Sequence, residues 1–269
     1  MGIGSQMVFW DDELVDRFVA QGFQVIRFDH RDIGLSSRLD HLPVPRPGPI
    51  VVRSLLSLPV AAPYTLSDMA GDVIGLLDHL GLDRVHVVGV SMGGMIAQHL
   101  AATAPGRVAS LTLMMTTSGA RSLPQPSWPV RRVLMSRPMR PGQQAAVDWI
   151  GHVLRVIGSP AYPMDTQAMQ ARALASVQRS WHPAGSARQL LAVVADGDRT
   201  PMLSRIQAPT LVIHGVDDPL VPFACGQDLA RRIAGARTDF ITGMGHDLPE
   251  PLLTRFADAI ADHAALAGT

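Results

Sequence analysis

The chain alternates between short segments that are mostly apolar and longer segments whose apolar residues have helical spacing. The short runs occupy residues 23–29, 84–90, 109–116, 210–215 and 237–242. Runs of this length are typical of strands buried in a sheet, and the segments between them are long enough to hold crossover helices. The alternation predicts an α/β protein with a mostly parallel sheet.

The segments between the short runs carry helical periodicity and residues that end helices. One helix is predicted to begin near Thr65 or Ser67 and to end at Gly81. Its apolar face consists of Leu66, Met69, Val73, Leu76, Leu77 and Leu80. Further helices are predicted over residues 92–104, 225–234 and 251–265.

Two segments interrupt the alternation. Residues 39–64 are rich in proline and form a long excursion after the first predicted strand. Residues 119–203 separate two predicted strands of one sheet and contain several helical stretches punctuated by proline. An insertion at this place favours a helical cap (lid) over the strand ends, and a second independent domain is the alternative. The predicted division is a core of residues 1–118 and 204–269 with a cap of residues 119–203.

Composition and charge restrict the function more than the fold. The chain has 269 residues, of which 47% are apolar, and its net charge is zero. These values fit one large domain and give no reason to expect nucleic acid or an acidic membrane surface as a partner. Cys225 is the only cysteine, so no internal disulfide can form and a reducing compartment fits. Without a signal-peptide pattern or an apolar run long enough to span a membrane, a cytoplasmic location is expected.

The strongest chemical signal is the stretch Gly89-Val90-Ser91-Met92-Gly93. It is a G-x-S-x-G motif between a predicted strand and a predicted helix, which is the context that this motif requires. The two glycines allow a sharp turn without a Cβ clash, so the serine side chain stands exposed at the strand tip. Ser91 is therefore the candidate nucleophile.

A serine nucleophile needs a base, and the base needs an acid that orients it. His246 lies in a glycine-rich loop after the last predicted strand and is the candidate base. The acid is expected in the loop after the strand at 210–215, where Asp218 is preferred and Asp217 is second. Structural roles are expected for three other histidines: His86, His99 and His214.

With these residues the chain resembles the α/β-hydrolase fold family along nearly its whole length. Residues 28–37 resemble the segment D-x-R-G-x-G-x-S of that family, with Asp32 where glycine is usual. The segments 62–81 and 196–215 resemble a bacterial branch of esterases that includes aclacinomycin methylesterase. The resemblance implies a serine-dependent mechanism, and it says little about the substrate because one fold hosts many reactions.

The resemblance also gives a meaning to the first residues of the chain. Met1-Gly2-Ile3 matches the family's His-Gly-x turn, which implies that the N–H groups of Ile3 and Met92 form an oxyanion hole. That turn normally follows a central strand, so a sheet lacking its N-terminal strands is predicted. The missing strand would lie between the predicted strands at 23–29 and 84–90. Its place can be filled in three ways: by residues upstream of Met1, by direct pairing of these two strands, or by another segment such as 49–56 or a partner chain. We expect the first, and a chain extended upstream to be more stable and more active.

The predicted function is hydrolysis of a small-molecule carboxylic ester, including methyl esters or lactones, without a metal or organic cofactor. Met95, Met135 and Met139 are predicted to line an apolar substrate pocket, although methionines at such places also fill cores. Two alternatives remain open at this point. One is another serine-triad reaction of the same fold, namely C–C bond hydrolysis, amide hydrolysis or cofactor-free perhydrolysis. The other is a ligand-binding protein without catalysis. The sequence does not indicate an oligomeric state.

Overall fold

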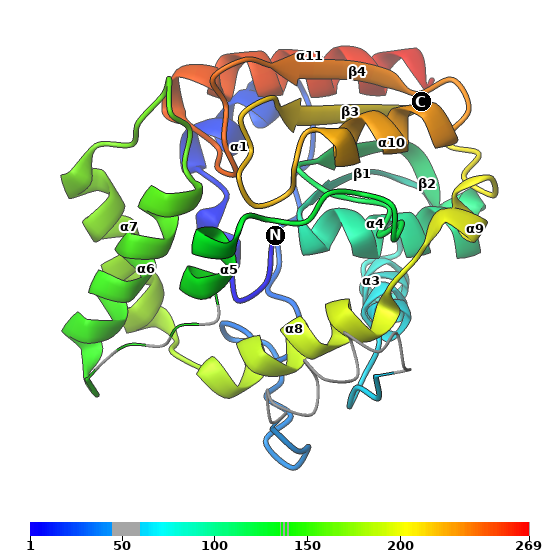
Figure 1. Cartoon of the computed structure of the whole chain (residues 1–269). Coiled ribbons are helices and arrows are strands. Elements are labelled where there is room, and N and C mark those ends of the chain that lie inside the picture. Colours follow the sequence, from blue (N-terminus) through cyan, green and yellow to red (C-terminus); the bar gives the residue numbers. More distant parts are fainter. Residues whose placement is uncertain (45–59, 135, 137, 139, 269) are drawn as a thin grey trace.

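The centre of the molecule is a parallel sheet whose strands follow chain order. The computed structural model describes residues 1–44, 60–134, 136, 138 and 140–268. Within these residues the order is β1-β2-β3-β4, and each neighbouring pair is parallel. The fold is therefore of the predicted α/β class (Figure 1). The strands are β1 (Val85–Val90), β2 (Val108–Met114), β3 (Thr210–Gly215) and β4 (Arg237–Ile241).

Four of the five predicted strands are confirmed to within two residues at each end. The prediction over residues 23–29 is wrong, because residues 23–30 belong to no strand or helix. A strand needs a partner, and β1 pairs only with β2 within the described residues. Within the described residues, the main-chain N–H and C=O groups of residues 24–28 make no hydrogen bond. Direct pairing of residues 23–29 with β1 is therefore not observed. Residues 49–56, the other segment that could take the place of the missing strand, lie outside the described residues.

A hollow of about 410 Å³ lies beside this unpaired segment. Its lining consists of Gln24, Val25, Ile26, Arg27, Leu80 and Leu82. The edge strand β1 is only partly buried over its first four residues, whereas β2 and β3 are buried throughout. The side of the sheet at β1 is thus less covered than its centre.

Helices cover both faces of the sheet. Figure 1 shows α3 and α4 on one face and α1 and α11 on the other. Neighbouring residues of β3 point to opposite faces, so that Leu211 packs in the core with α1 and α11 and Val212 packs with α3 and α4. The predicted helices that follow the strands are confirmed. The helices of this core are α1 (Asp12–Ala20), α3 (Leu66–His79), α4 (Met92–Thr103), α10 (Ala224–Arg232) and α11 (Leu253–Leu266).

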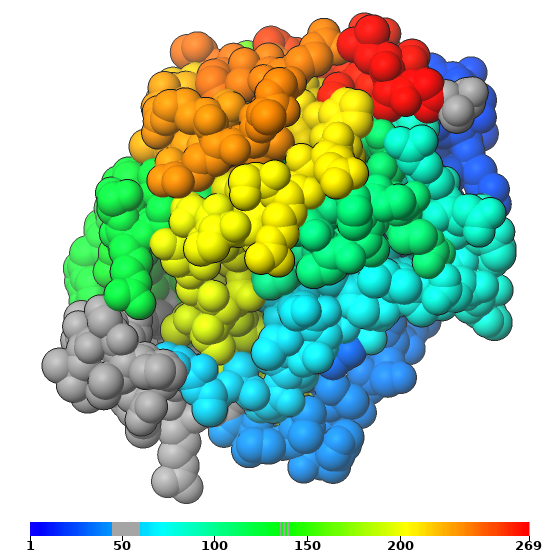
Figure 2. Space-filling model, turned by 90° about the vertical axis from the view of Figure 1, so that its right-hand side faces the viewer, coloured from blue at the N-terminus to red at the C-terminus, as the bar shows by residue number. Residues whose placement is uncertain are grey.

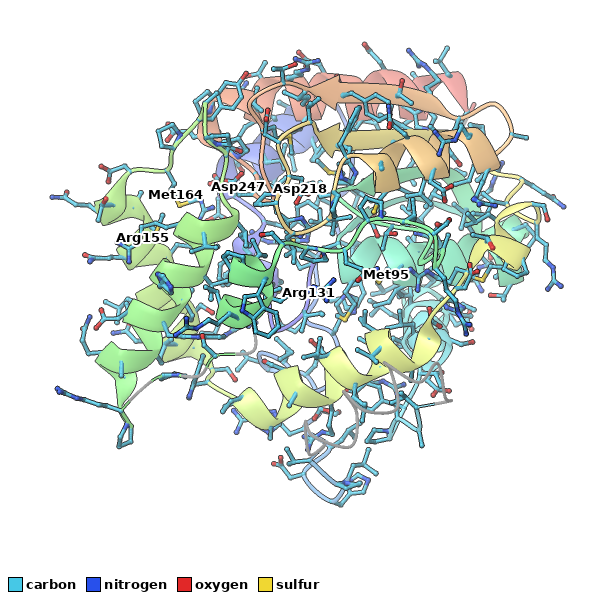
Figure 3. The ribbon with its side chains drawn as sticks, viewed as in Figure 1. Met95, Arg131, Arg155, Met164, Asp218 and Asp247 are labelled. Atoms are coloured by element: carbon cyan, nitrogen blue, oxygen red, sulfur yellow. The ribbon has the colours of Figure 1, made fainter. Side chains whose placement is uncertain are left out.

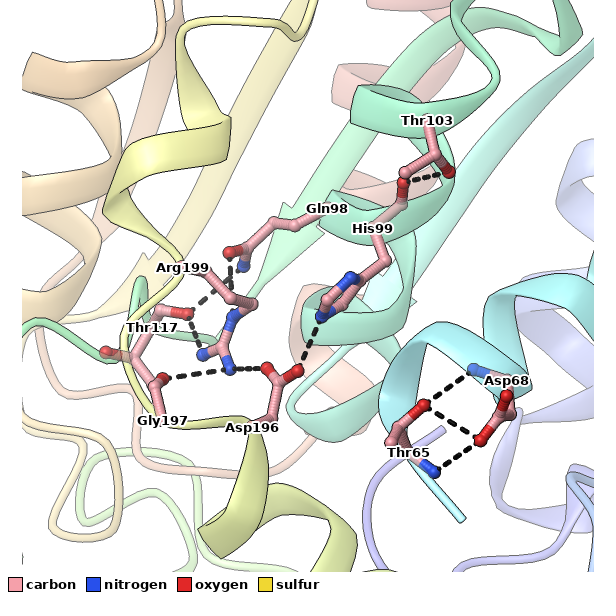
Figure 4. Close-up of polar contacts among 9 residues, drawn as sticks. All are labelled: Thr65, Asp68, Gln98, His99, Thr103, Thr117, Asp196, Gly197 and Arg199. Atoms are coloured by element: carbon pink, nitrogen blue, oxygen red, sulfur yellow. Dashed lines mark hydrogen bonds and ion pairs between the residues drawn. The ribbon is translucent and has the colours of Figure 1, made fainter. Parts of the chain in front are cut away.

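Helix α3 begins with a capping box. The Thr65 hydroxyl accepts from the Asp68 N–H at 3.0 Å, and the Asp68 carboxylate accepts from the Thr65 N–H at 2.8 Å (Figure 4). Of the two predicted start positions, Thr65 is therefore the N-cap. The two bonds satisfy main-chain donors that the first helical turn leaves free.

Replacing Thr65 with Ala is expected to lower the free energy of unfolding by about 1 kcal/mol, because one capping acceptor is lost. Urea denaturation of both proteins measures this difference. Thr103→Ala is the matched control, since the Thr103 hydroxyl donates to the His99 carbonyl near the end of α4 and caps no N–H group. An equal loss in the two variants would contradict the capping role.

Between β2 and β3, the described residues form a helical insertion. Figure 1 shows α5, α6 and α7 on the side of the sheet toward which the β3 arrow points. Helices α6 and α7 share a small apolar cluster of their own, formed by Ala146, Val147, Ala173 and Val177. The helices of the insertion are α5 (Trp128–Leu134), α6 (Gln143–Ile157), α7 (Thr166–Arg179), α8 (Pro183–Asp196) and α9 (Thr200–Leu203).

The end of the insertion is anchored to the core by Arg199. Its buried guanidinium donates to the Thr117 carbonyl at 2.9 Å, to Gln98 Oε1 at 3.2 Å, and to the carboxylate of Asp196 (Figure 4). His99 on α4 contacts the other oxygen of Asp196 at 2.7 Å. Figure 2 shows the segment from α8 to β3 (yellow) crossing the surface between the α10 region (orange) and α3 (cyan).

Candidate active site

Ser91 stands on a strained turn between β1 and α4. Its φ of 55° and ψ of −118° lie outside the regions that residues with a Cβ prefer. A Cβ at Gly89 would lie 2.4 Å from the Gly93 carbonyl oxygen, so the turn needs glycine there. The Ser91 N–H donates to the Met114 carbonyl at 2.9 Å, and Thr116 Oγ1 donates to the Ser91 carbonyl at 2.7 Å. The end of β2 thus holds the strained turn in place.

His246 and Asp218 meet in the loops that follow β4 and β3. His246 Nδ1 lies 2.7 Å from Asp218 Oδ2, and both side chains are buried. The other carboxylate oxygen of Asp218 accepts from the N–H groups of Leu220 and Val221, each at 2.8 Å. Since a carboxylate only accepts, Nδ1 carries a hydrogen, so in the neutral form of the ring the lone pair is on Nε2. This is the tautomer that a general base requires.

The second candidate carboxylate has another partner. Asp217 Oδ2 accepts from the Gly243 N–H at 2.7 Å and so ties the loop after β3 to the loop after β4. Of the two neighbouring aspartates, Asp218 is the one that is bonded to His246.

His214 lies near the Asp218 carboxylate, and its contacts are those of a structural residue. Burial lowers its pKa, so the ring is neutral near pH 7. Its Nε2 donates to the Val221 carbonyl at 2.8 Å and is 3.8 Å from the Asp218 carboxylate. His86 contacts Ser110 at 2.9 Å within the sheet.

The turn at residues 2–4 lies against Ser91. A Cβ at Gly2 would be 3.3 Å from Ser91 Cβ and 3.6 Å from Ser91 Oγ. Within the described residues, the N–H groups of Ile3 and Met92 donate no hydrogen bond. Both N–H groups are therefore free within this part of the chain; Met92 follows Ser91 in the chain, and Ile3 follows Gly2. The neighbouring Gly4 N–H is occupied, because it donates to Gln189 Oε1 on α8 at 2.9 Å.

Other predicted residues are placed differently. In the described part of the chain, no hydrogen bond joins Ser91 Oγ to His246, whose Nδ1 is bonded to Asp218. Met95 comes from α4 (Figure 3) and packs in the core cluster that α4 shares with α3. Met135 and Met139 lie outside the described residues.

Sequence reasoning missed the residues that hold the His246 loop. The His246 N–H donates to the Ile157 carbonyl at 2.7 Å, and the Gly245 N–H donates to Ser159 Oγ at 2.8 Å. Ser159 also donates to Asp247, which lies close to Asp218 beside the insertion (Figure 3). Burial raises the pKa of Asp247. The only sequence signal was the carboxylate directly after the candidate base.

The described residues contain neither a membrane-spanning helix nor a metal-binding cluster. No helix among them is both long and apolar enough to cross a membrane. No three His, Cys, Asp or Glu side chains in this part of the chain are grouped as ligands of a metal ion.

Comparison with known proteins assigns the chain to a family. Residues 2–250 match the alpha/beta hydrolase fold family, and the chain belongs to it. The chain is similar to the rhodomycin D methylesterase DnrP of Streptomyces peucetius, with 30% identity over 96% of this chain and 87% of the relative. It is also similar to the rhodomycin D methylesterase DauP of Streptomyces sp. strain C5, with 29% identity over the same shares of the two chains. These matches make the protein a hydrolase.

Solved structures agree on the fold. A hydrolase from Pseudomonas aeruginosa has 26% identity and a TM-score of 0.62, and covers 100% of this chain and 88% of its own. The meta-cleavage product hydrolase from Pseudomonas fluorescens IP01 has a TM-score of 0.74 over 99% of this chain and 88% of its own, with 19% identity. The second likeness concerns the fold alone.

Proposed function

We propose that this protein is a serine esterase that hydrolyses carboxylic esters through a triad of Ser91, His246 and Asp218. The observation that carries the proposal is the hydrogen bond from His246 Nδ1 to Asp218, which leaves Nε2 free as a base. The strained turn at Ser91 follows β1, and the two loops follow β3 and β4. Since the strands are parallel, all three residues lie at the carboxyl ends of the strands.

The chemistry follows from these groups. His246 Nε2 takes the proton of the Ser91 hydroxyl while Oγ attacks the ester carbonyl carbon. Asp218 holds the imidazole in its tautomer and stabilises the imidazolium that forms. The imidazolium then gives its proton to the departing alcohol. Water, activated by the same imidazole, releases the acid from Ser91.

The negative charge on the carbonyl oxygen needs hydrogen-bond donors. The main-chain N–H groups of Ile3 and Met92 are the proposed donors, because neither donates a hydrogen bond within the described residues. Met92 follows Ser91 in the chain, and Ile3 follows Gly2, which lies against Ser91. The N-terminus of α4, which starts at Met92, adds the positive end of its dipole. Each such donor typically stabilises the transition state by about 3 kcal/mol.

The substrate is proposed to be a small-molecule ester. It would be held between the carboxyl ends of the strands and the helical insertion, which acts as a cap. The similarity to rhodomycin D methylesterases supports a methyl ester. Met135 and Met139 remain the proposed pocket residues, whereas Met95 packs in the core cluster of α3 and α4. The proposed reaction uses no metal or organic cofactor, and a cytoplasmic location is part of the proposal.

A substrate panel tests the proposed reaction. We expect turnover of p-nitrophenyl esters of short and long acids and of methyl esters of aromatic acids, and much slower turnover of a matched anilide and a β-diketone. Faster cleavage of the β-diketone or the anilide would replace the esterase assignment with C–C bond or amide hydrolysis. Perhydrolysis would appear as peracid formation from acetate and hydrogen peroxide. Saturable binding of the esters without turnover would indicate a ligand-binding protein.

A further inference from the structure

The segment after α6 runs along the loop that carries His246. The Ala161 N–H donates to the Gly243 carbonyl at 3.0 Å, and the Ile157 carbonyl accepts from the His246 N–H at 2.7 Å. A Cβ at Gly243 would lie 2.3 Å from the Ala161 Cβ. The two segments therefore touch through their main chains, and the base loop rests on the insertion.

Ser159 lies at the middle of this contact and is 4% exposed. Its Oγ accepts from the Gly245 N–H at 2.8 Å and donates to Asp247 Oδ1. The hydroxyl thus binds both residues that flank His246 in the chain. A Cβ at Gly245 would lie 2.4 Å from the Gly158 carbonyl oxygen, so the glycine permits the close approach that these bonds need.

We propose that Ser159 is a positioning residue for His246, which fixes the base relative to Ser91 and couples it to the helical insertion. The inference rests on the proposed role of His246 as the base. The bond to Asp218 sets the orientation of the imidazole about Nδ1. It does not set where the loop stands, and a shift of the loop would swing Nε2 away from Ser91. The hydrogen bonds of Ser159 on both sides of His246 resist that shift.

A displacement of about 1 Å in a reacting group can cost about 100-fold in rate. Ser159 itself touches no reacting atom and acts only through the position of His246. Its loss should therefore slow the chemical step and leave substrate binding nearly unchanged. A residue that only stabilised the fold would lower the melting temperature without this separation of kcat from KM.

The experiment compares Ser159→Ala with the native protein on p-nitrophenyl acetate. We expect kcat to fall by roughly 10- to 100-fold while KM changes less than about 2-fold. Ser159→Thr, which keeps a hydroxyl, should restore most of kcat. The matched control is Ser110→Ala, because Ser110 is 3% exposed and, among the described residues, its hydroxyl is hydrogen-bonded only to His86 in the sheet. Ser110→Ala should keep the native kcat even where its melting temperature falls.

Variants at Asp247 test the same contact from the other side. Asp247→Asn keeps an acceptor for the Ser159 hydroxyl and should keep most of kcat, whereas Asp247→Leu removes the acceptor and should lower kcat. These variants decide the matter if Ser159→Ala does not fold.

His246→Ala separates the proposed triad from the positioning role of Ser159. Full activity in His246→Ala would overturn the proposed triad. An inactive His246→Ala together with native kcat in Ser159→Ala, or in Asp247→Leu, would overturn only the positioning role of Ser159.

Discussion

Replacing Ser91 with Ala is expected to reduce ester hydrolysis by about 10⁴-fold or more, because the acyl-enzyme can no longer form. The fold should persist, since the main-chain bonds of Ser91 to Met114 and Thr116 do not involve its hydroxyl. Esterase assays, circular dichroism and thermal denaturation of both proteins test the two statements. Ser204→Ala, at an exposed position after α9, is the control and should keep full activity.

A fluorophosphonate probe gives an independent test of the same residue. The probe reacts with activated serines, and mass spectrometry of the digested adduct should locate it on Ser91. The adduct should be absent in Ser91→Ala and weak in His246→Ala, where no base activates the hydroxyl. An adduct that persists in Ser91→Ala at the native rate would show that another serine is the nucleophile.

The parts of the fold that the sequence predicted depend on local patterns. The strand at 210–215 was placed to the residue, because its apolar run is bounded by proline and glycine. The strand predicted over 23–29 has an equally good pattern and is not a strand, because strand formation also requires a neighbour with which to pair. A single sequence carries the pattern of a segment but not the presence of its partner.

The candidate site divides in the same way. Ser91, His246 and Asp218 could be proposed because the motif and the chain order after each strand are local. The contact between Ser159 and Asp247 joins residues 88 positions apart, and no spacing rule connects them. The bond from Gly4 to Gln189 spans 185 positions. Contacts between the insertion and the catalytic loops arise from packing, which periodicity does not reveal.

Asp32 shows how a departure from a family motif acquires a partner. It occupies the place where the family usually has glycine, and its φ of 71° is one that glycine tolerates and aspartate does not prefer. Its carboxylate forms two hydrogen bonds of 2.8 Å with Nε and an NH₂ group of Arg188 on α8, and both residues are 0% exposed. The Leu39 N–H adds a third bond at 2.8 Å. The insertion is thereby fastened to the loop after residue 29 through a fully buried ion pair.

Arg188→Leu is expected to lower the free energy of unfolding by about 3–5 kcal/mol, because it leaves the Asp32 carboxylate buried without a counter-charge. Asp32→Gly should also destabilise the protein, although it relieves the strain at φ 71°, because Arg188 loses its two hydrogen bonds to a buried carboxylate and the ion pair that remains, with Asp40, is longer at 3.6 Å. The double variant with both changes should recover most of the loss, since it buries no charge. Urea denaturation of the four proteins measures these differences, and equal losses in the single and double variants would contradict the pairing.

The pair also predicts how stability depends on pH. Burial by itself would raise the pKa of Asp32, but the hydrogen bonds from Arg188 and Leu39 outweigh it and hold the pKa below the usual range. A carboxyl whose pKa is lower in the folded state contributes stability above its unfolded pKa. That contribution is lost as the pH falls through the folded value. The native protein should therefore lose stability in acid more steeply than the double variant, which has no carboxyl at this position. Parallel curves for the two proteins from neutral pH down to acid unfolding would mean that the Asp32 carboxylate gains nothing from Arg188.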